Sequence, residues 1–261
     1  MPEISVLVFT GFRAAAERAA QRLRTMEFEG LLLNLPEEME GFLKSYINGR
    51  MDLEELLKSY RYLTGSSQPF VNALRYRMEP LLTALPILGE RRRGLMVECY
   101  QDLESSISSR NLSERLLLLE AAERIRGRIS VTKWRDLLRE EIRYAEERWL
   151  RERENIVEKA GRHPRSLVLY GGSPKALKEY LERRGFSVNV VFTQRYWRPP
   201  LEVLRMIASL RGVEELCDRV ISDCVQRHLQ YLDYILLSGN IDEAHEKWTR
   251  ENAPFPIATP P

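Results

Sequence analysis

The sequence predicts an α/β fold that is rich in helices, with a mostly parallel or mixed sheet of about five strands wrapped by many helices. Short unbroken apolar runs alternate along the chain with longer stretches whose apolar residues recur every three to four positions. Unbroken runs are typical of strands buried on both faces, and the helices between them supply the crossovers that parallel strands need. A chain of 261 residues is long enough to bury such a sheet in a substantial core.

Five apolar runs are expected to form the strands. The first, ISVLVFT, is unbroken, and the second, FEGLLLNLP, ends at Pro36, which has no N–H to donate to a strand ladder. The fourth, SLVLY, is closed by two glycines. The expected strands cover residues 4–10, 28–36, 94–100, 166–170 and 186–192.

Helical periodicity fills the intervals between these runs. Ala16, Ala20 and Leu23 form one apolar stripe, as expected of an amphipathic helix. Asp52 and Glu55 have the spacing of a capping box at the start of a later helix. The expected helices cover residues 13–26, 37–47, 52–64, 69–84, 101–109, 113–126, 132–160, 174–184, 199–211, 213–238 and 241–249. We expect one domain over 1–250, with 37–90 as a candidate helical cap subdomain, and a proline-rich tail over 251–261.

The charge balance and the apolar pattern argue against several classes of partner. A net charge of +2 falls short of the strongly basic surface that nucleic-acid binding favours. No apolar run approaches the ~18 residues of a membrane span, and the acidic Glu3 without a preceding basic region argues against a signal peptide. Three cysteines, an odd number, give no disulfide framework. We expect a cytoplasmic protein whose partner is a small molecule or another protein, with homo-oligomerisation left open.

The composition also bears on the source of the protein. Arginine supplies 33 of the 40 basic residues, and asparagine and glutamine together number only 14. Few amides and many charges resemble heat-adapted proteins and favour a thermophilic, archaeal-like source. GC-rich coding would raise the share of arginine equally well.

Candidate site residues follow from where ligands bind in this class of fold. In open α/β sheets, ligands collect beyond the carboxyl ends of the strands. Thr10 and Arg13 follow the first expected strand, Glu37 follows the second, and Glu98 lies near the end of the third. We therefore expect Thr10 and Arg13 to be available for binding, and the two carboxylates for binding or catalysis.

The turn after the fourth strand has features of an anion site. Gly171 and Gly172 allow the backbone a sharp turn and a close approach, Ser173 can cap the next helix, and Pro174 suits its first turn. A helix N-terminus favours an anion, and Lys175 could add a charge. An ordinary capped strand–helix turn would have the same sequence, which matches no Walker or dinucleotide-binding motif.

The helix expected over 132–160 carries charged residues in its apolar stripe. Its spacing aims Glu152 or Arg153 toward the sheet, where a charge is costly unless it is paired or belongs to a site. We expect at least one of the two to be largely buried and hydrogen-bonded to another strand end, with Glu98 as the best partner for Arg153. The alternative is that Arg153 extends to solvent and Glu152 pairs with Arg148, four positions before it.

The histidines give no support to metal chemistry. His163 precedes the fourth strand and so belongs at the amino end of the sheet, while His228 and His245 lie on later helices. No HExxH, CxxC or Ser-His-Asp arrangement can be assembled from neighbouring motifs. We expect no bound metal and no cofactor.

Three stretches share the order and rhythm of a known superfamily. They are VLVFTGFRAAAERAAQRL, GLLLNLPEEMEGFL and RERENIVEKAGRHPRSLVLYGGSPKALKEYLERRGFSVNVV, within residues 4–45 and 149–192. In this order the chain resembles the TraB/TIKI superfamily, which includes erythromycin-esterase-like and ChaN-like proteins. That family places a G-x-x-H motif after the first strand and again after a later one, with an acid at the end of the second. The resemblance implies a site at these strand ends, used in the family for metal-dependent or general-base hydrolysis.

The chain departs from the family at each of these positions. Phe12 and Pro174 stand where the two histidines would lie, and Asn34 replaces the acid. Phenylalanine and proline side chains can neither bind a metal nor accept a proton.

The leading functional hypothesis is therefore a noncatalytic or divergent member of this fold that binds a ligand or a protein partner. Glu37, Glu98, Glu152 and Arg153 remain as polar groups that could line the same crevice. One alternative is a hydrolase that uses carboxylates such as Glu98 and Glu152 in place of histidine. The other is phosphate or nucleotide binding at residues 171–175.

Overall fold

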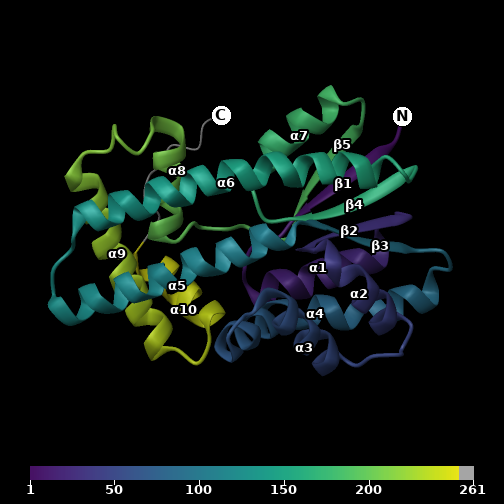
Figure 1. Ribbon diagram of the computed structural model, residues 1–261, viewed down its shortest axis with the longest axis horizontal. Coiled ribbons are helices and arrows are strands. Elements are labelled where there is room, and N and C mark those ends of the chain that lie inside the picture. Colours follow the sequence, from purple (N-terminus) through teal and green to yellow (C-terminus); the bar gives the residue numbers. More distant parts are fainter. Residues whose placement is uncertain (253–261) are drawn as a thin grey trace. The chain divides into compact units, whose positions relative to one another are not determined.

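The computed structural model describes residues 1–252 and confirms the α/β, helix-rich fold that the sequence predicts (Figure 1). In the described chain five strands, all parallel, form one sheet in the order β3-β2-β4-β1-β5. The strands are β1 (Glu3–Val8), β2 (Gly30–Pro36), β3 (Met96–Gln101), β4 (Arg165–Tyr170) and β5 (Ser187–Phe192). Each lies within a residue or two of its predicted bounds.

The helices follow the predicted intervals, except that the helix predicted over 213–238 begins only at Asp218. They are α1 (Arg13–Thr25), the short 3-10 helix η1 (Glu37–Met39), α2 (Glu40–Ile47), α3 (Leu53–Thr64), α4 (Gln68–Arg91), α5 (Leu103–Arg126), α6 (Val131–Ala160), α7 (Pro174–Arg183), α8 (Pro200–Arg211), α9 (Asp218–Leu237) and α10 (Ile241–Glu251). The capping box expected at the start of α3 is present, since Asp52 accepts the Glu55 N–H and Glu55 accepts the Asp52 N–H.

Two helices are longer than predicted because packing overrides local sequence. α4 continues through Pro80 and Pro86 to Arg91, where the sequence suggested an end near residue 84. Each proline removes a helix hydrogen bond, but the leucines around them are buried in the core. α5 is one helix where two were predicted: its serine-rich first turns, poor in helix propensity, are held by burial of Ser105 and Ser106.

Side chains that alternate along the strands fill a core on each face of the sheet. Leu31, Leu33 and Leu35 of β2 point toward α1, α2 and α4, and Leu32 between them points to the opposite core with Ile156 of α6. Figure 1 shows α1 to α4 on one side of the sheet, and α7 with the last turns of α6 on the other. Both faces are therefore covered, as the unbroken apolar runs predict.

The chain divides into two compact units. Unit 1 comprises residues 1–110 and 147–195 and holds the whole sheet, and unit 2 comprises 111–146 and the chain from 196 onward. Unit 2 has its own helical core, which includes Trp134 of α6 and Leu204 of α8. The single domain predicted over 1–250 stays a prediction, and the predicted cap segment 37–90 lies within unit 1.

Two further predictions concern the ends and the membrane. Most of the tail predicted over 251–261 lies outside the described residues, since α10 runs to Glu251 and the description ends at residue 252. Within the described residues, none of the helices combines the length and the apolar character that crossing a bilayer would require.

Candidate functional site

The carboxyl ends of three neighbouring strands present polar side chains to the face that α6 covers. Tyr100 of β3 and Tyr170 of β4 belong to the core on that face. Asn34 of β2 lies between Leu33 and Leu35, which both point to the other face, so strand alternation places Asn34 on the α6 side. The Tyr100 hydroxyl donates to the backbone carbonyl of residue 169 at 2.7 Å, which ties two of these strand ends together.

Glu152 of α6 is a buried carboxylate at this place, with only 3% of its surface exposed. Its charged partner is Arg148, one turn earlier, whose Nε lies 3.4 Å from Glu152 Oε1. Burial raises the pKa of Glu152; Arg148 lowers it, and the charge of Asp102 raises it further. The net direction is upward, so the cost of burying the charge exceeds the attraction of the arginine.

Polar atoms without hydrogen-bond partners gather around the same turn of α6. Seven buried side-chain polar atoms of the described residues make no hydrogen bond; four of them belong to residues 148–153 of α6, and a fifth belongs to Asn34, on the same side of the sheet. They are Asn34 Oδ1, Arg148 Nε, Trp149 Nε1, Glu152 Oε1 and Arg153 Nε. Buried polar atoms are nearly always paired, so this group of three donors and two acceptors has unused hydrogen-bonding capacity.

Aromatic rings surround these atoms. Burial raises the pKa of Tyr170, and the nearby Glu152 carboxylate raises it further. Arg148 lowers the pKa of Tyr170, as does Trp149, although the indole N–H forms no well-aligned hydrogen bond. Gly172 is required by this packing: a Cβ there would lie 2.6 Å from the Tyr170 hydroxyl oxygen. The site is thus a polar group set among tyrosines and a tryptophan.

The predicted pairing of Arg153 with Glu98 is wrong. The Arg153 guanidinium lies over the rings of Trp149 and Tyr180, 4.2 Å and 4.3 Å from their centres. Glu98 instead binds Arg162 at 2.8 Å and His163 at 2.9 Å. The prediction that Glu152 or Arg153 is buried is confirmed by Glu152. The hydrogen bond predicted from that residue to another strand end is wrong, since Glu152 Oε1 and Arg153 Nε make no hydrogen bond, and the Glu152–Arg148 pair proposed as the alternative is present.

Glu98 pairs with residues other than Arg153 because of where β3 and α6 end. β3 runs on to Gln101, so Glu98 lies in the middle of the strand and not at its carboxyl end. α6 ends at Ala160, ~12 Å of helix axis beyond Glu152, and the turn that follows brings Arg162 and His163 to Glu98. His163 contacts Gly30, the first residue of β2, so it lies at the amino end of the sheet as predicted.

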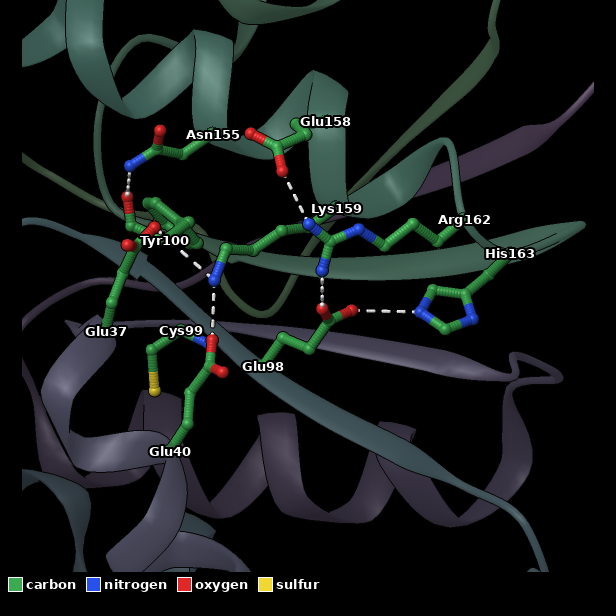
Figure 2. A network of polar contacts seen from close by, with 10 residues as sticks. All are labelled: Glu37, Glu40, Glu98, Cys99, Tyr100, Asn155, Glu158, Lys159, Arg162 and His163. Atoms are coloured by element: carbon green, nitrogen blue, oxygen red, sulfur yellow. Dashed lines mark hydrogen bonds and ion pairs between the residues drawn. The ribbon is translucent and has the colours of Figure 1, made fainter.

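Figure 2 shows the network that holds these side chains. Lys159 of α6 lies between Glu37 and Glu40, with Nζ–Oε1 distances of 3.3 Å and 2.6 Å. Burial lowers the pKa of Lys159, and the two carboxylates more than offset this, so its pKa is raised. Glu40 also accepts the backbone N–H of Cys99 at 2.9 Å, in the edge strand β3.

This network accounts for Glu37 and Glu98 without invoking catalysis. Glu40 and Asn155 bond to backbone groups of the edge strand β3, and backbone groups of an edge strand are otherwise open to pairing with another strand. Asn155 adds to it by donating to the Tyr100 carbonyl at 3.0 Å. Glu37 and Glu98 are therefore engaged in contacts that attach α6 and η1 to the edge of the sheet.

The predicted anion turn has the expected backbone but not the expected cap. Ser173 is the N-cap residue of α7 and Pro174 its first residue, as predicted, but the Ser173 side chain makes no capping hydrogen bond. Neither Gly171 nor Gly172 has a positive φ, so the backbone conformation of this turn does not require glycine. Gly171, Gly172, Ser173 and Lys175 are exposed, and their role in binding stays a prediction.

The remaining predicted binding residues make structural contacts. Thr10 Oγ1 accepts from Gln194 Nε2 at 3.1 Å. Arg13 donates to Glu79 at 3.0 Å and to the backbone carbonyl of Tyr76 at 3.2 Å, which joins α1 to α4. Phe12, in the position of the missing histidine, is buried before α1.

Sequence reasoning missed part of the site. Tyr100 and Tyr170 end their apolar runs and could have been noticed as polar groups at strand ends. Trp149 belongs to the apolar stripe of α6, and nothing in the sequence distinguishes its indole N–H as unpaired. In the residues that the structure describes, no group of three His, Cys, Asp or Glu side chains is placed to hold a metal ion.

The fold and this site define a parallel α/β protein with an unsatisfied polar cluster at the strand ends. No family model, curated protein or solved structure matches the chain.

Proposed function

We propose that this chain is a ligand-binding protein on a TraB/TIKI-like fold, without the histidine chemistry of that family. The ligand would bind among Asn34, Arg148, Trp149 and Glu152, where α6 covers the carboxyl ends of β2, β3 and β4. One observation carries the proposal: of the seven buried side-chain polar atoms without a hydrogen bond in the described residues, four lie on one turn of α6, and a fifth belongs to Asn34, which faces the same side of the sheet. Such atoms are costly in a folded protein, and a bound ligand that pairs with them would remove the cost.

The chemistry of these atoms indicates the kind of ligand. Arg148 and Trp149 offer donors suited to a carboxylate, and Glu152 and Asn34 offer acceptors suited to an ammonium group. The ion pair of Arg148 with Glu152 makes the site nearly balanced in charge. A small zwitterion, of which a free amino acid is the simplest, would satisfy both sets of atoms.

Binding is favoured over the hydrolysis that the family resemblance implies. The positions of the family's histidines hold Phe12 and Pro174, which cannot act on a proton or a metal. The two oxygens of Glu98 are engaged by Arg162 and His163, so Glu98 is not free to act with Glu152 as a catalytic pair. The raised pKa of Glu152 does favour a second candidate, general-acid catalysis by this one carboxyl group.

Calorimetric titration with each of the proteinogenic amino acids tests the proposal, with acetate and ethylamine as half-ligand controls and inorganic phosphate as a separate probe. At least one amino acid should bind and raise the melting temperature by several degrees, more than either half-ligand. Glu152→Gln should weaken that binding by roughly 10- to 100-fold, because a charge-assisted hydrogen bond is lost. Glu158→Gln, an exposed carboxylate on the same helix, is the matched control.

Two results would overturn the proposal: that no amino acid binds, or that Glu152→Gln binds as tightly as the parent. Binding of phosphate alone, unchanged by Glu152→Gln, would instead support the anion turn at residues 171–175. Release of a product from an amino-acid ester or amide, lost in Glu152→Gln, would favour general-acid catalysis.

A further inference from the structure

Two neighbouring strands of the sheet send the chain to opposite faces at their carboxyl ends. β1 and β4 are adjacent, and the last pair in their register is Val8 with Tyr170. After β1 the chain enters α1, which packs in the core that contains Leu31. After β4 it enters α7, which packs with Leu32 in the core on the other face (Figure 1). Ligands of open α/β sheets bind at this kind of position, just beyond two strands whose connections diverge.

Arg77 of α4 lies at this position. Its guanidinium is next to Gly11, which follows β1, because a Cβ on Gly11 would lie 3.6 Å from Arg77 Nη1. Arg77 is exposed, yet the surrounding protein desolvates the guanidinium and lowers its pKa. A cation that is desolvated and still accessible is surrounded by protein on several sides and open to solvent on another. A charged ligand can therefore reach it.

The guanidinium of Arg77 has no carboxylate partner among the described residues. Its one hydrogen bond there is long, 3.4 Å from Nε to the backbone carbonyl one turn earlier. The only group whose charge raises its pKa is the Tyr60 hydroxyl. Arg13 and Arg75, in contrast, both pair with Glu79. A desolvated cation is costly unless an anion pairs with it, so Arg77 has both the need and the donors for an anionic ligand.

Backbone N–H groups lie on both sides of the same position. In the part of the chain that the structure describes, Gly11, Gly171 and Gly172 donate no backbone hydrogen bond, and all three are exposed. Gly171 lies beside the chain that leaves β1, since a Cβ there would be 3.8 Å from the Phe9 carbonyl oxygen. Without side chains, these residues leave their N–H groups accessible to a ligand.

We propose that the position beyond β1 and β4 binds the phosphate group of a small molecule, held by Arg77 and by backbone N–H groups of the loops at residues 9–12 and 171–173. A guanidinium can give two parallel N–H donors to one phosphate. Together with the backbone donors, these exceed what the two oxygens of a carboxylate accept and suit the three terminal oxygens of a phosphate monoester. Neither loop contains an acidic residue that would repel the ligand. The site does not use Glu152, so it is separate from the amino-acid site proposed above.

Calorimetric titration of the full-length protein with inorganic phosphate tests this site, and acetate tests the carboxylate alternative. Phosphate should bind and raise the melting temperature, and acetate should bind at least about tenfold more weakly. Arg77→Gln should weaken phosphate binding by roughly 10- to 100-fold, because charge-assisted hydrogen bonds are lost. Without phosphate, this variant should be at least as stable as the parent, since the change breaks no ion pair and removes a desolvated charge.

Two variants serve as controls. Arg165→Gln removes the same charge at the opposite end of β4, where Arg165 forms an exposed pair with Glu27, and should bind phosphate within about twofold of the parent, because distant exposed charges are screened by salt. Glu152→Gln should also bind phosphate like the parent, whereas it should lose the amino acid.

Four results would overturn the proposal. They are that phosphate does not bind, that Arg77→Gln and Arg165→Gln weaken its binding equally, or that acetate binds as tightly as phosphate and is lost equally in Arg77→Gln. The fourth is phosphate binding that is lost in Lys175→Gln and kept in Arg77→Gln, which would place the phosphate at the start of α7 alone.

Discussion

Replacing Glu152 by glutamine should make the protein more stable at neutral pH and leave its stability unchanged in mild acid. Burial raises the pKa of Glu152 above its ordinary value near 4.5, despite the attraction of Arg148. The folded state therefore holds the proton more tightly than the unfolded state. Stability is greatest below the unfolded pKa, where Glu152 is protonated in both states, and it falls as the pH rises through the folded pKa.

The magnitude follows from two opposing effects. The Arg148–Glu152 separation of 3.4 Å corresponds to ~5 kcal/mol of attraction at an effective dielectric constant of 20. Burying an ionised carboxylate costs several kcal/mol, and the raised pKa of Glu152 shows that this cost is the larger. Glutamine keeps the shape without the charge. We expect a gain of about 1–2 kcal/mol at pH 8, which is the order of one unsatisfied buried group.

Thermal and denaturant unfolding of both proteins at pH 8 and at pH 4 measure this difference. A gain of this size corresponds to roughly 2–8 °C in melting temperature. The gap between variant and parent should close at pH 4, because Glu152 is then neutral in the parent. Glu158→Gln, on the exposed face of the same helix, should change stability by less than about 0.5 kcal/mol. A Glu152→Gln variant that is less stable at pH 8, or a gap independent of pH, would refute the reasoning.

Two further substitutions test the contacts around the edge of the sheet. Gly30→Ala should destabilise the protein by about 1–3 kcal/mol, because a Cβ at residue 30 would lie 2.4 Å from the His163 ring. In a His163→Ala background most of that cost should vanish. Denaturant unfolding of the parent, the two single variants and the double variant measures the coupling. Lys159→Met should lower the free energy of unfolding by about 1.5–3 kcal/mol, because it removes the cation that Glu40 binds. Lys178→Met, in an exposed ion pair, should lower it by less than about 1 kcal/mol. Equal losses in the two variants would contradict a structural role for the buried Lys159.

The fold was predictable because the elements that build it are local in sequence. The run GLLLNLP is apolar at almost every position, as a strand covered on both faces must be, and it forms β2 within two residues of the predicted span. The 30-residue α6 follows from its periodic stripe. That stripe nevertheless serves two cores, since Trp134 packs in unit 2 and Ile156 in unit 1, a division that periodicity alone does not reveal.

The sequence by itself also determined that a charge of α6 would face the sheet, since helical spacing fixes the direction of Glu152 relative to its neighbours. Only the tertiary structure decided which groups meet. Because of where α6 ends and how β3 is paired, Glu98 binds Arg162 and His163. Glu152 is paired only with Arg148, and its Oε1 atom makes no hydrogen bond. The partners of a side chain depend on where distant helices and strands end, and these positions are set by the packing of the whole unit. The burial of a strand, in contrast, can be predicted from the apolar residues of the strand itself.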